Sequence, residues 1–208
     1  MQQVKLDIPT LVLGAGIAGS GKTTILKEVV PRVRDSLYVQ KDSINDTFLM
    51  PFNHSGVIET YVPIGAPISR ETNHYHKYVK FQTYHSMLSL AKDNLLLGKH
   101  PMLDGNYTKE IRAGYIEKVV DPFFRKTPHR RKIVFCHAPE SVIRKRLTQC
   151  GTLLRDADKL RSARRLEKFI IEQPPLPLEI DDYDHIKVNT AQPIGKNIKA
   201  ILAYLQGG

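Results

Sequence analysis

One stretch decides the fold of this chain of 208 residues: Gly14-Ala15-Gly16-Ile17-Ala18-Gly19-Ser20-Gly21-Lys22-Thr23-Thr24. It follows a short apolar run at residues 10–13. It precedes a segment, 22–34, whose apolar residues recur with helical spacing. The order is therefore strand, glycine-rich loop, helix. Two glycine patterns overlap in this loop, and they predict different ligands.

The first pattern, G-x-G-x-x-G, begins at Gly14 and is typical of dinucleotide-binding loops. It would place Gly21 inside the first helical turns, where an interior glycine costs about 1 kcal/mol relative to alanine. It also leaves Lys22 and Thr23 without a role. The second pattern, G-x-x-x-x-G-K-S/T, is the phosphate loop and uses all of these residues. The sequence therefore favours the phosphate loop.

In a phosphate loop, successive backbone N–H groups point at phosphate oxygens, and the following helix adds the positive end of its dipole. Lys22 would then contact the terminal phosphates. The hydroxyl of Thr23 would bind Mg²⁺, which prefers oxygen ligands. The predicted nucleotide-binding residues are Gly16, Ile17, Ala18, Gly19, Ser20, Gly21, Lys22, Thr23 and Thr24.

Beyond the loop, short apolar runs alternate with helix-forming segments. We predict further strands over 36–40, 102–105, 132–137 and 184–190, helices over 108–125 and 194–205, and one long helix or two short ones over 71–97. Such alternation is typical of a parallel sheet covered by helices on both faces. The predicted fold class is a three-layer α/β/α domain that spans residues 1–208.

Composition limits the class of protein. The longest apolar run has eight residues, 11–18, whereas about 20 are needed to cross a bilayer. Residues 1–7 contain no apolar core of a signal peptide. Cys136 and Cys150 cannot form a disulfide framework and make no C-x-x-C pair. We therefore expect a soluble, cytoplasmic protein without membrane contact, in which both cysteines are packing residues.

The formal net charge of +10 is unevenly distributed. Thirteen basic and three acidic residues lie between Arg125 and Arg165, so this segment carries the whole excess. Positive potential attracts nucleic acid, nucleotides or a phosphorylated substrate. The alternative interpretation is a solvated basic face that improves solubility.

The chain resembles the P-loop kinase superfamily, in particular the group that includes polynucleotide kinase, zeta-toxin and chloramphenicol phosphotransferase. The resemblance covers nearly the whole chain. Its motifs are the phosphate loop, Lys41-Asp42, Leu103-Asp104-Gly105, Ala138-Pro139 with Arg146, and Arg155-Asp156 with Lys159-Leu160. It implies ATP as donor, Mg²⁺ as cofactor, and a five-stranded parallel sheet in the order 2-3-1-4-5. That order would place Asp104 beside the phosphate loop.

The resemblance implies a role for two carboxylates. Asp42 would accept a proton from the acceptor hydroxyl or orient it, although an aspartate here is also a good N-cap for the next helix. Asp104 would bind the metal through water, beside Thr23. Its alternative role is that of a turn residue in Asp-Gly-Asn.

The resemblance also assigns catalytic cations. Lys22 would act on the terminal phosphates, while Arg146 and Arg155 would neutralise charge on the transferred phosphoryl group. Arg155 belongs to a predicted lid over residues 147–165, and Arg146 immediately precedes that lid, which would exclude water when it closes.

Residues 43–100 form the predicted substrate-binding helical insertion, which is rich in aromatic residues and histidine. Its rings would stack on a base or cover a sugar, unless they are core and surface residues of a helix. The expected reaction is ATP-dependent phosphorylation of a hydroxyl on a small molecule: a sugar, a nucleoside or an antibiotic-like acceptor.

Two alternatives concern the acceptor, and one concerns the class of protein. Nucleic acid is the first, in a polynucleotide 5'-hydroxyl kinase. Such relatives carry an arginine three residues after the aspartate, where this chain has Asn45. A zeta-toxin-like nucleotide-sugar kinase is the second. A nucleotide-binding switch that transfers nothing is the alternative class, but the chain has no N-K-x-D motif for guanine.

Overall fold

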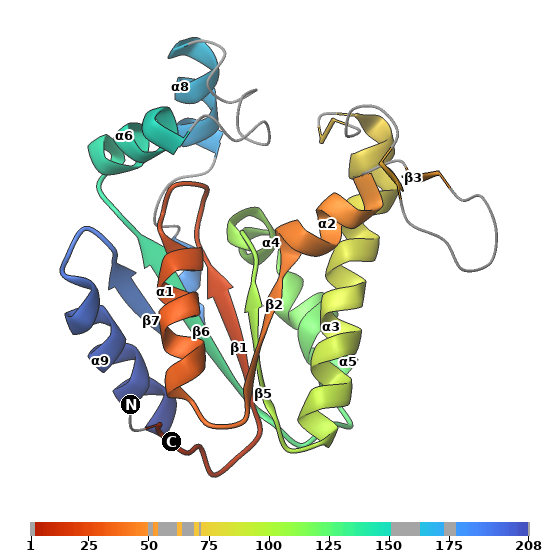
Figure 1. The fold of residues 1–208 in the computed structure, drawn as a ribbon, viewed down its shortest axis with the longest axis vertical. Helices are drawn as coiled ribbons and strands as arrows, with labels where there is room; N and C mark the ends of the chain where they lie inside the picture. The colour runs from red at the N-terminus through yellow and green to blue at the C-terminus, as the bar shows by residue number, and fades with distance from the viewer. Residues whose placement is uncertain are drawn as a thin grey trace.

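The computed structural model describes residues 3–49, 52–53, 62–63, 69–70, 72–150, 163–172 and 178–207. Five parallel strands form the central sheet in the order β2-β5-β1-β6-β7 (Figure 1). The strands are β1 (Thr10–Ala15), β2 (Ser36–Gln40), β5 (His100–Asp104), β6 (Arg130–His137) and β7 (His185–Asn189). Counted along the chain, this is the predicted order 2-3-1-4-5. The predicted fold class is therefore confirmed.

Helices connect the strands. They are α1 (Lys22–Val29), α2 (Lys41–Leu49), α3 (Lys80–Leu96), α4 (Thr108–Arg112), α5 (Asp121–Phe124), α6 (Glu140–Cys150), α8 (Ala163–Glu172) and α9 (Ile194–Gln206). Short 3₁₀ turns are η1 (Val30–Arg32) and η4 (Leu178–Asp182), and π turns are η2 (Tyr75–Val79) and η3 (Ile116–Val120). An antiparallel pair, β3 (Phe52–Asn53) and β4 (Val62–Pro63), lies within the predicted insertion.

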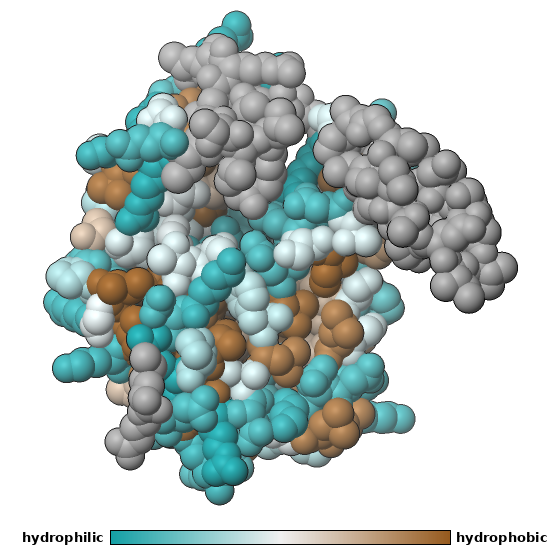
Figure 2. All heavy atoms as spheres, in the orientation of Figure 1, coloured by the Kyte–Doolittle hydropathy of each residue, from teal (hydrophilic) through white to brown (hydrophobic). Residues whose placement is uncertain are grey.

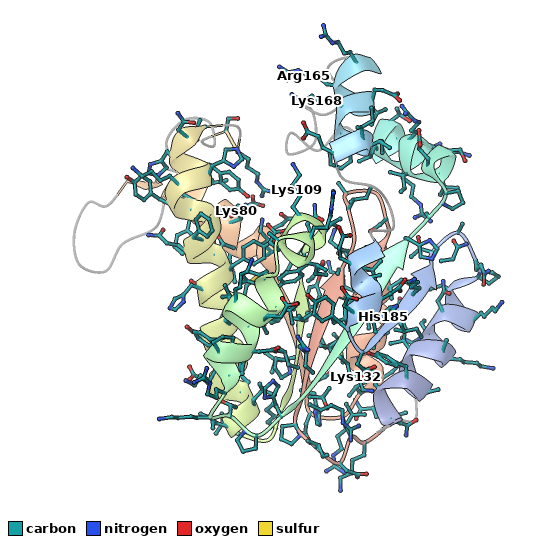
Figure 3. All side chains as sticks on the ribbon, turned by 180° about the vertical axis from the view of Figure 1, so that it is seen from behind. Lys80, Lys109, Lys132, Arg165, Lys168 and His185 are labelled. Atoms are coloured by element: carbon teal, nitrogen blue, oxygen red, sulfur yellow. The ribbon has the colours of Figure 1, made fainter. Side chains whose placement is uncertain are left out.

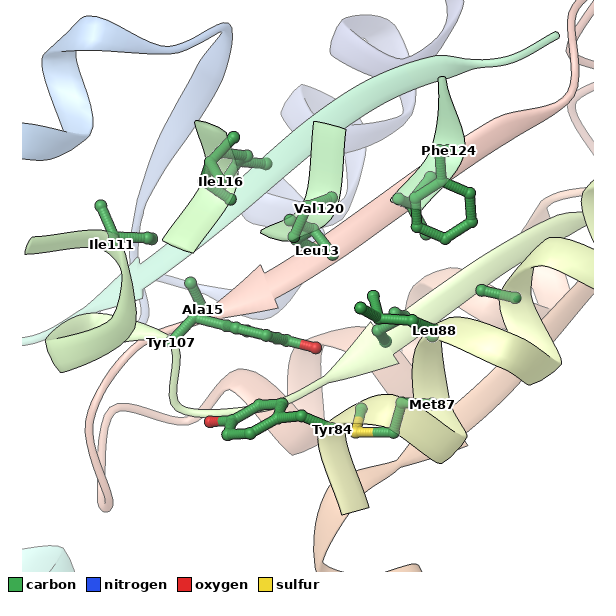
Figure 4. Packing of buried hydrophobic residues seen from close by; sticks show 14 of the residues in the cluster. Leu13, Ala15, Tyr84, Met87, Leu88, Tyr107, Ile111, Ile116, Val120 and Phe124 are labelled. Atoms are coloured by element: carbon green, nitrogen blue, oxygen red, sulfur yellow. The ribbon is translucent and has the colours of Figure 1, made fainter. Parts of the chain in front are cut away.

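Alternate residues of each central strand face opposite layers of helices. In β1, Leu11 and Leu13 pack with α3, η3 and α5, whereas Val12 packs with α1 and α9. Figure 4 shows the first of these layers, with the rings of Tyr84 and Tyr107 packed beside the sheet. Because both faces are covered, β1 is buried along its whole length, is apolar after Thr10, and shows no polar alternation.

The segment predicted as one helix over 108–125 is divided into α4, η3 and α5, so that prediction is wrong. Gly114 adopts φ +73° after α4, a left-handed conformation that ends helices. Pro122 then occupies the first turn of α5, where its missing N–H costs nothing. In the predicted helix over 71–97, the described part begins with η2 before it continues as α3.

The carboxyl ends of the parallel strands place the predicted site residues at one edge of the sheet. The glycine loop follows β1, Lys41-Asp42 follows β2, and Asp104 ends β5. This is the edge at which open α/β sheets bind ligands.

Part of the predicted lid adjoins this edge. Helices α6 and α8 share an apolar cluster with Ile17 of the glycine loop. Residues 151–162, with Arg155 among them, lie outside the described part of the chain. The lid over 147–165 and the insertion over 43–100 stay predictions as units, and β5 already begins at His100. In the described ranges, no helix combines the length and apolarity that a membrane span needs.

Candidate nucleotide and acceptor site

Two glycines give the loop after β1 its shape. Gly16 has φ +136°, and a Cβ there would overlap the carbonyl oxygen of Cys136 in β6. Gly21 has φ +83° and is the N-cap of α1. A Cβ on Gly21 would lie 3.0 Å from Thr190 Oγ1. Only glycine fits both positions without strain, and the loop delivers the chain to the N-terminus of α1, where anions bind favourably.

Arg146 and Thr190 hold the far side of this loop. Arg146 Nη1 donates to Thr190 Oγ1 at 2.8 Å and to the carbonyl of Gly19 at 3.2 Å, and Nη2 donates to the carbonyl of Thr190 at 2.9 Å. The hydroxyl of Thr190 donates to the carbonyl of Ser20 at 2.7 Å. Arg146 therefore cross-links α6, the loop and the residue that follows β7.

A second cluster joins β5, α1 and β2. Asp104 Oδ2 accepts hydrogen bonds from Thr23 Oγ1 at 2.6 Å and from Tyr38 Oη at 2.5 Å. Asp104 is buried, with 3% of its surface exposed. Burial and the adjacent Asp104 carboxylate raise the pKa of the Tyr38 hydroxyl, so Tyr38 stays a hydrogen-bond donor at all physiological pH values.

These residues fit a magnesium ion. A carboxylate and a threonine hydroxyl lie 2.6 Å apart at the start of α1, beside Lys22, and both are oxygen ligands. In the described ranges, no group of three or more histidine, cysteine, aspartate or glutamate side chains could hold a metal. Mg²⁺ usually keeps several waters and takes its other ligands from phosphates, which suits a site with one carboxylate.

A cavity of about 690 Å³ opens at this edge of the sheet. The predicted residues Lys22, Thr23, Asp42, Asp104 and Arg146 all line it. Its volume is in the usual range for small-molecule sites. Hydrophilic residues are visible at this end of the molecule in the space-filling view (Figure 2). The structure thus brings together residues from four widely separated segments.

Asp42 lies in the first turn of α2 and is not the N-cap that precedes it. Its Oδ1 accepts a hydrogen bond from Arg70 Nη1 at 2.8 Å, and Arg70 also pairs with Asp46. The Asp42 side chain is 29% exposed and that of Asp46 is 65% exposed. Of the two carboxylates, only Asp42 lines the cavity. Arg70 therefore fixes the orientation of the Asp42 carboxylate at the cavity wall.

Asn45 explains one departure from the polynucleotide-kinase pattern. It is completely buried, donates to Tyr75 Oη at 3.2 Å, and accepts from Thr83 Oγ1 at 2.8 Å. An arginine would not fit this enclosed position between α2 and α3. Asn45 is therefore a structural residue, and a guanidinium reaches Asp42 from Arg70 instead.

The part of the cavity wall formed by α3 and α4 carries further charged and aromatic groups. Lys80 pairs with Glu110 at 2.8 Å, and both line the cavity with Tyr84 and Lys109. Figure 3 shows Lys80 and Lys109 at the ends of α3 and α4 that face the opening. Arg165 and Lys168 project from α8 on the other side of it (Figure 3).

The predicted nucleotide-binding residues divide into two groups. Ala18, Gly19, Gly21, Lys22, Thr23 and Thr24 line the cavity. Ile17 and Ser20 are buried beneath it, and Gly16 packs against β6. Every one of these residues stays a predicted ligand. Arg155, which is outside the described residues, is the one predicted catalytic residue that the structure does not place.

The sequence analysis assigned no role in the site to four residues: Tyr38, Lys41, Arg70 and Thr190. Lys41 belongs to the same motif as Asp42, so its position next to Asp42 was the signal that could have identified it. Tyr38 alternates with buried Val39 in a strand, which indicates a face but not a partner. Arg70 and Thr190 lie in connecting segments without a motif, so no sequence signal identified them.

No protein-family model matches the chain, and no curated protein matches it by sequence. Solved structures do resemble it. A candidate kinase from Chloroflexus aurantiacus j-10-fl is 18% identical, with a TM-score of 0.66, over 96% of this chain and 97% of that one. A gluconokinase from Sinorhizobium meliloti 1021 is 12% identical, with a TM-score of 0.52, over 97% and 93%. The chain thus has the P-loop kinase-type fold that the resemblance implied.

Proposed function

We propose that this chain is an ATP-dependent kinase that transfers the γ-phosphoryl group of ATP to a hydroxyl of a small molecule. One observation carries the proposal. The carboxylate of Asp42 lines the same cavity as the phosphate-loop residues Lys22 and Thr23. A protein that only binds a nucleotide needs the loop, but it does not need a second carboxylate across the cavity.

The loop side of the cavity binds the nucleotide. Backbone N–H groups of the loop up to Thr24 would receive the phosphates, except that of Gly16, which donates to the carbonyl of Asn106 at 2.9 Å. Lys22 would add a positive charge at the terminal phosphate. Thr23 and Asp104 would hold Mg²⁺, which, when bound, neutralises charge on the β- and γ-phosphates. Tyr38 keeps Asp104 in place through its hydrogen bond to Oδ2.

The opposite side positions the acceptor. The hydroxyl oxygen of the acceptor forms a bond to the γ-phosphorus while the bond from that phosphorus to the bridging oxygen breaks. ADP leaves with the electron pair. Asp42 orients the hydroxyl and takes its proton, the role of a general base in phosphoryl transfer. Arg146 and Arg155 would neutralise charge on the phosphoryl group, and Arg146 lies beside the loop at Gly19.

Two further facts support a small acceptor. The similar solved structures bear kinase names, and one of them is a gluconokinase. The cavity also has a volume typical of sites that enclose small ligands. A polynucleotide 5'-hydroxyl end and a nucleotide sugar stay the alternative acceptors, and a nucleotide switch stays the alternative class.

Nucleotide binding tests the proposal first. Calorimetry with Mg-ATP should give a dissociation constant that rises about 10- to 100-fold in Lys22→Met, since a hydrogen bond to a charged group contributes about 1.5–3 kcal/mol. Lys199→Met, an exposed lysine on α9 away from the cavity, is the matched control and should bind like the wild type.

Transfer is tested second, with γ-labelled ATP and a panel of alcohols, sugars, nucleosides, nucleotides and 5'-hydroxyl oligonucleotides. Label in a small acceptor is the expected result. Label in oligonucleotides alone would favour the nucleic-acid alternative. ATP binding without transfer to any acceptor would contradict the kinase and favour the switch.

A further inference from the structure

The wall of the cavity formed by α2, Arg70, α3 and α4 has its own charge balance. We call this the acceptor end and define it by its described charged residues: Lys41, Asp42, Arg70, Lys80, Lys109 and Glu110. Four are cations and two are carboxylates. The acceptor end is therefore positive by two charges before any ligand binds.

The carboxylates already have partners. Asp42 pairs with Arg70 at 2.8 Å and Glu110 pairs with Lys80 at 2.8 Å. Lys109 contacts Glu172 of α8 at 3.3 Å, but both side chains are about half exposed, and such pairs contribute little. Within the described ranges, Lys41 makes no ion pair at all. The excess charge therefore resides mainly on Lys41 and Lys109.

Lys41 is held in place without an anion. Its Nζ lies 3.3 Å from Tyr75 Oη and 5.2 Å from the centre of the Tyr84 ring. Tyr75 is in turn fixed by the buried Asn45. A phenol oxygen and a ring face orient an ammonium but do not neutralise it. The ammonium is thus positioned at the cavity, with donors left for a ligand.

Two neighbouring features favour an anion at the same place. Lys41 is the first residue of α2, so the positive end of the helix dipole adds to its charge. The next residue along the chain is Asp42, which lines the same cavity. An anionic group bound at Lys41 would therefore hold the rest of the acceptor close to the carboxylate that receives the hydroxyl proton.

We infer that the acceptor carries an anionic group, a carboxylate or a phosphate, which binds Lys41 while the acceptor hydroxyl faces Asp42. This inference rests on the proposed kinase function and specifies its substrate class. Neutral alcohols and sugars would leave the Lys41 ammonium without a counter-ion in a partly enclosed site, which costs binding free energy.

Matched pairs of acceptors test the inference. D-Gluconate is compared with D-glucitol for the carboxylate, and adenosine 3'-monophosphate with adenosine for the phosphate, each with labelled ATP and Mg²⁺. We expect the charged member of at least one pair to have a kcat/KM at least tenfold higher than its neutral partner. The pair that shows the preference identifies the anion.

Variants of Lys41 assign that preference to the residue. Lys41→Met should reduce the charged-to-neutral ratio at least tenfold, Lys41→Arg should keep most of it, and Lys199→Met should leave it unchanged. Binding of the charged probe in the presence of Mg²⁺ and a non-hydrolysable ATP analogue gives a second readout and should weaken in Lys41→Met alone.

The outcomes separate the two proposals. If a neutral member is phosphorylated as well as its charged partner, or if Lys41→Met keeps the full ratio, the anionic acceptor is wrong while the kinase stands. If ATP binds but no member of either pair, nor any compound of the wider panel, is phosphorylated, the kinase fails and the inference fails with it.

Discussion

The two ends of the cavity are built from different materials. The phosphate-loop end is made largely of backbone from one short stretch, between Ala18 and Thr24, and is braced by Arg146 and Thr190. The acceptor end is made of side chains from α2, Arg70, η2, α3 and α4. In the proposed function, the first end would bind the phosphates, which are the same in every nucleoside triphosphate. The second is free to vary with the acceptor.

This difference determines what each end tolerates. A site made of backbone depends on φ and ψ at a few glycines, so a substitution that adds a side chain there should weaken ligand binding. A site made of side chains depends on which charges face the cavity, so a substitution that changes one of these charged groups should weaken binding. The variants below separate these two kinds of failure.

Asp42→Asn should have the largest effect. It keeps the shape of the side chain but removes the base, and general base catalysis contributes about 100- to 10,000-fold to a rate. We expect kcat to fall by that amount while the dissociation constant for Mg-ATP stays within twofold. Rapid-quench transfer assays and calorimetry measure the two quantities.

Asp46→Asn is the matched control, because Asp46 contacts the same arginine but lies outside the cavity. It should change kcat less than threefold. Equal losses in the two variants would mean that the Arg70 pairs stabilise the fold and that Asp42 has no separate catalytic role.

Gly21→Ala should damage the loop end. Its φ of +83° costs an L-residue about 1–2 kcal/mol, and the new Cβ would also press on Thr190 and Arg146. We expect at least tenfold weaker Mg-ATP binding together with the loss of stability. Gly98→Ala has φ +74° but open space around it, so it should lose similar stability, seen by urea unfolding, and no affinity.

Tyr38→Phe should raise the Mg²⁺ requirement for nucleotide binding about tenfold, because removing the partner of a metal-site carboxylate typically costs 10- to 100-fold in metal affinity. Calorimetric titrations of ATP at several Mg²⁺ concentrations measure this. Tyr183→Phe removes a surface hydrogen bond to Glu117 and should behave like the wild type. An unchanged Mg²⁺ dependence in Tyr38→Phe would mean that Asp104 does not act on the metal.

His100 should give the smallest effect, on stability alone. Burial lowers its pKa, and its Nδ1 accepts a hydrogen bond from the Thr10 N–H at 3.1 Å, so the folded state holds the neutral ring. Below the unfolded value of 6.5 the unfolded chain binds the proton more readily, and the free energy of unfolding falls as pH falls.

The variant His100→Asn keeps an acceptor for Thr10 but does not titrate. Between pH 7.5 and 5.5, the wild type should lose more unfolding free energy than this variant, by at most about 1.4 kcal/mol, the limit for one proton taken up one pH unit below the unfolded pKa. Urea titrations at the two pH values measure the difference. Identical losses would show that His100 contributes nothing to the acid sensitivity.

The sequence predicted the loop end well because its information is local. Gly16 to Thr24 are consecutive, and the strand and helix that flank them have clear apolar patterns. The strand order and the position of Asp104 beside the phosphate loop followed from the resemblance, whereas its hydrogen bond with Thr23 came from the structure. The division of the segment between Thr108 and Phe124 into three short helical elements was not predicted, although Gly114 indicated a helix end there.

The acceptor end was predicted poorly because its partners meet only in three dimensions. Arg70 and Asp42 are separated by 28 residues, and nothing in the letters around Arg70 specifies its partner. Asn45 shows the opposite error, in which the sequence suggests a functional role that the structure does not support. It occupies a motif position that suggests substrate contact, but its burial between α2 and α3 gives it a structural role.

The hydrogen bond from Thr190 to Ser20 joins residues 170 positions apart. During synthesis on the ribosome, the complete phosphate-loop motif therefore emerges well before Thr190, the residue that braces it. A nascent chain would thus contain the phosphate-loop motif long before it could form the braced loop that we propose binds the nucleotide. Termination between residues 24 and 190 would then yield a fragment that contains the phosphate-loop motif but lacks the hydrogen bond that braces it.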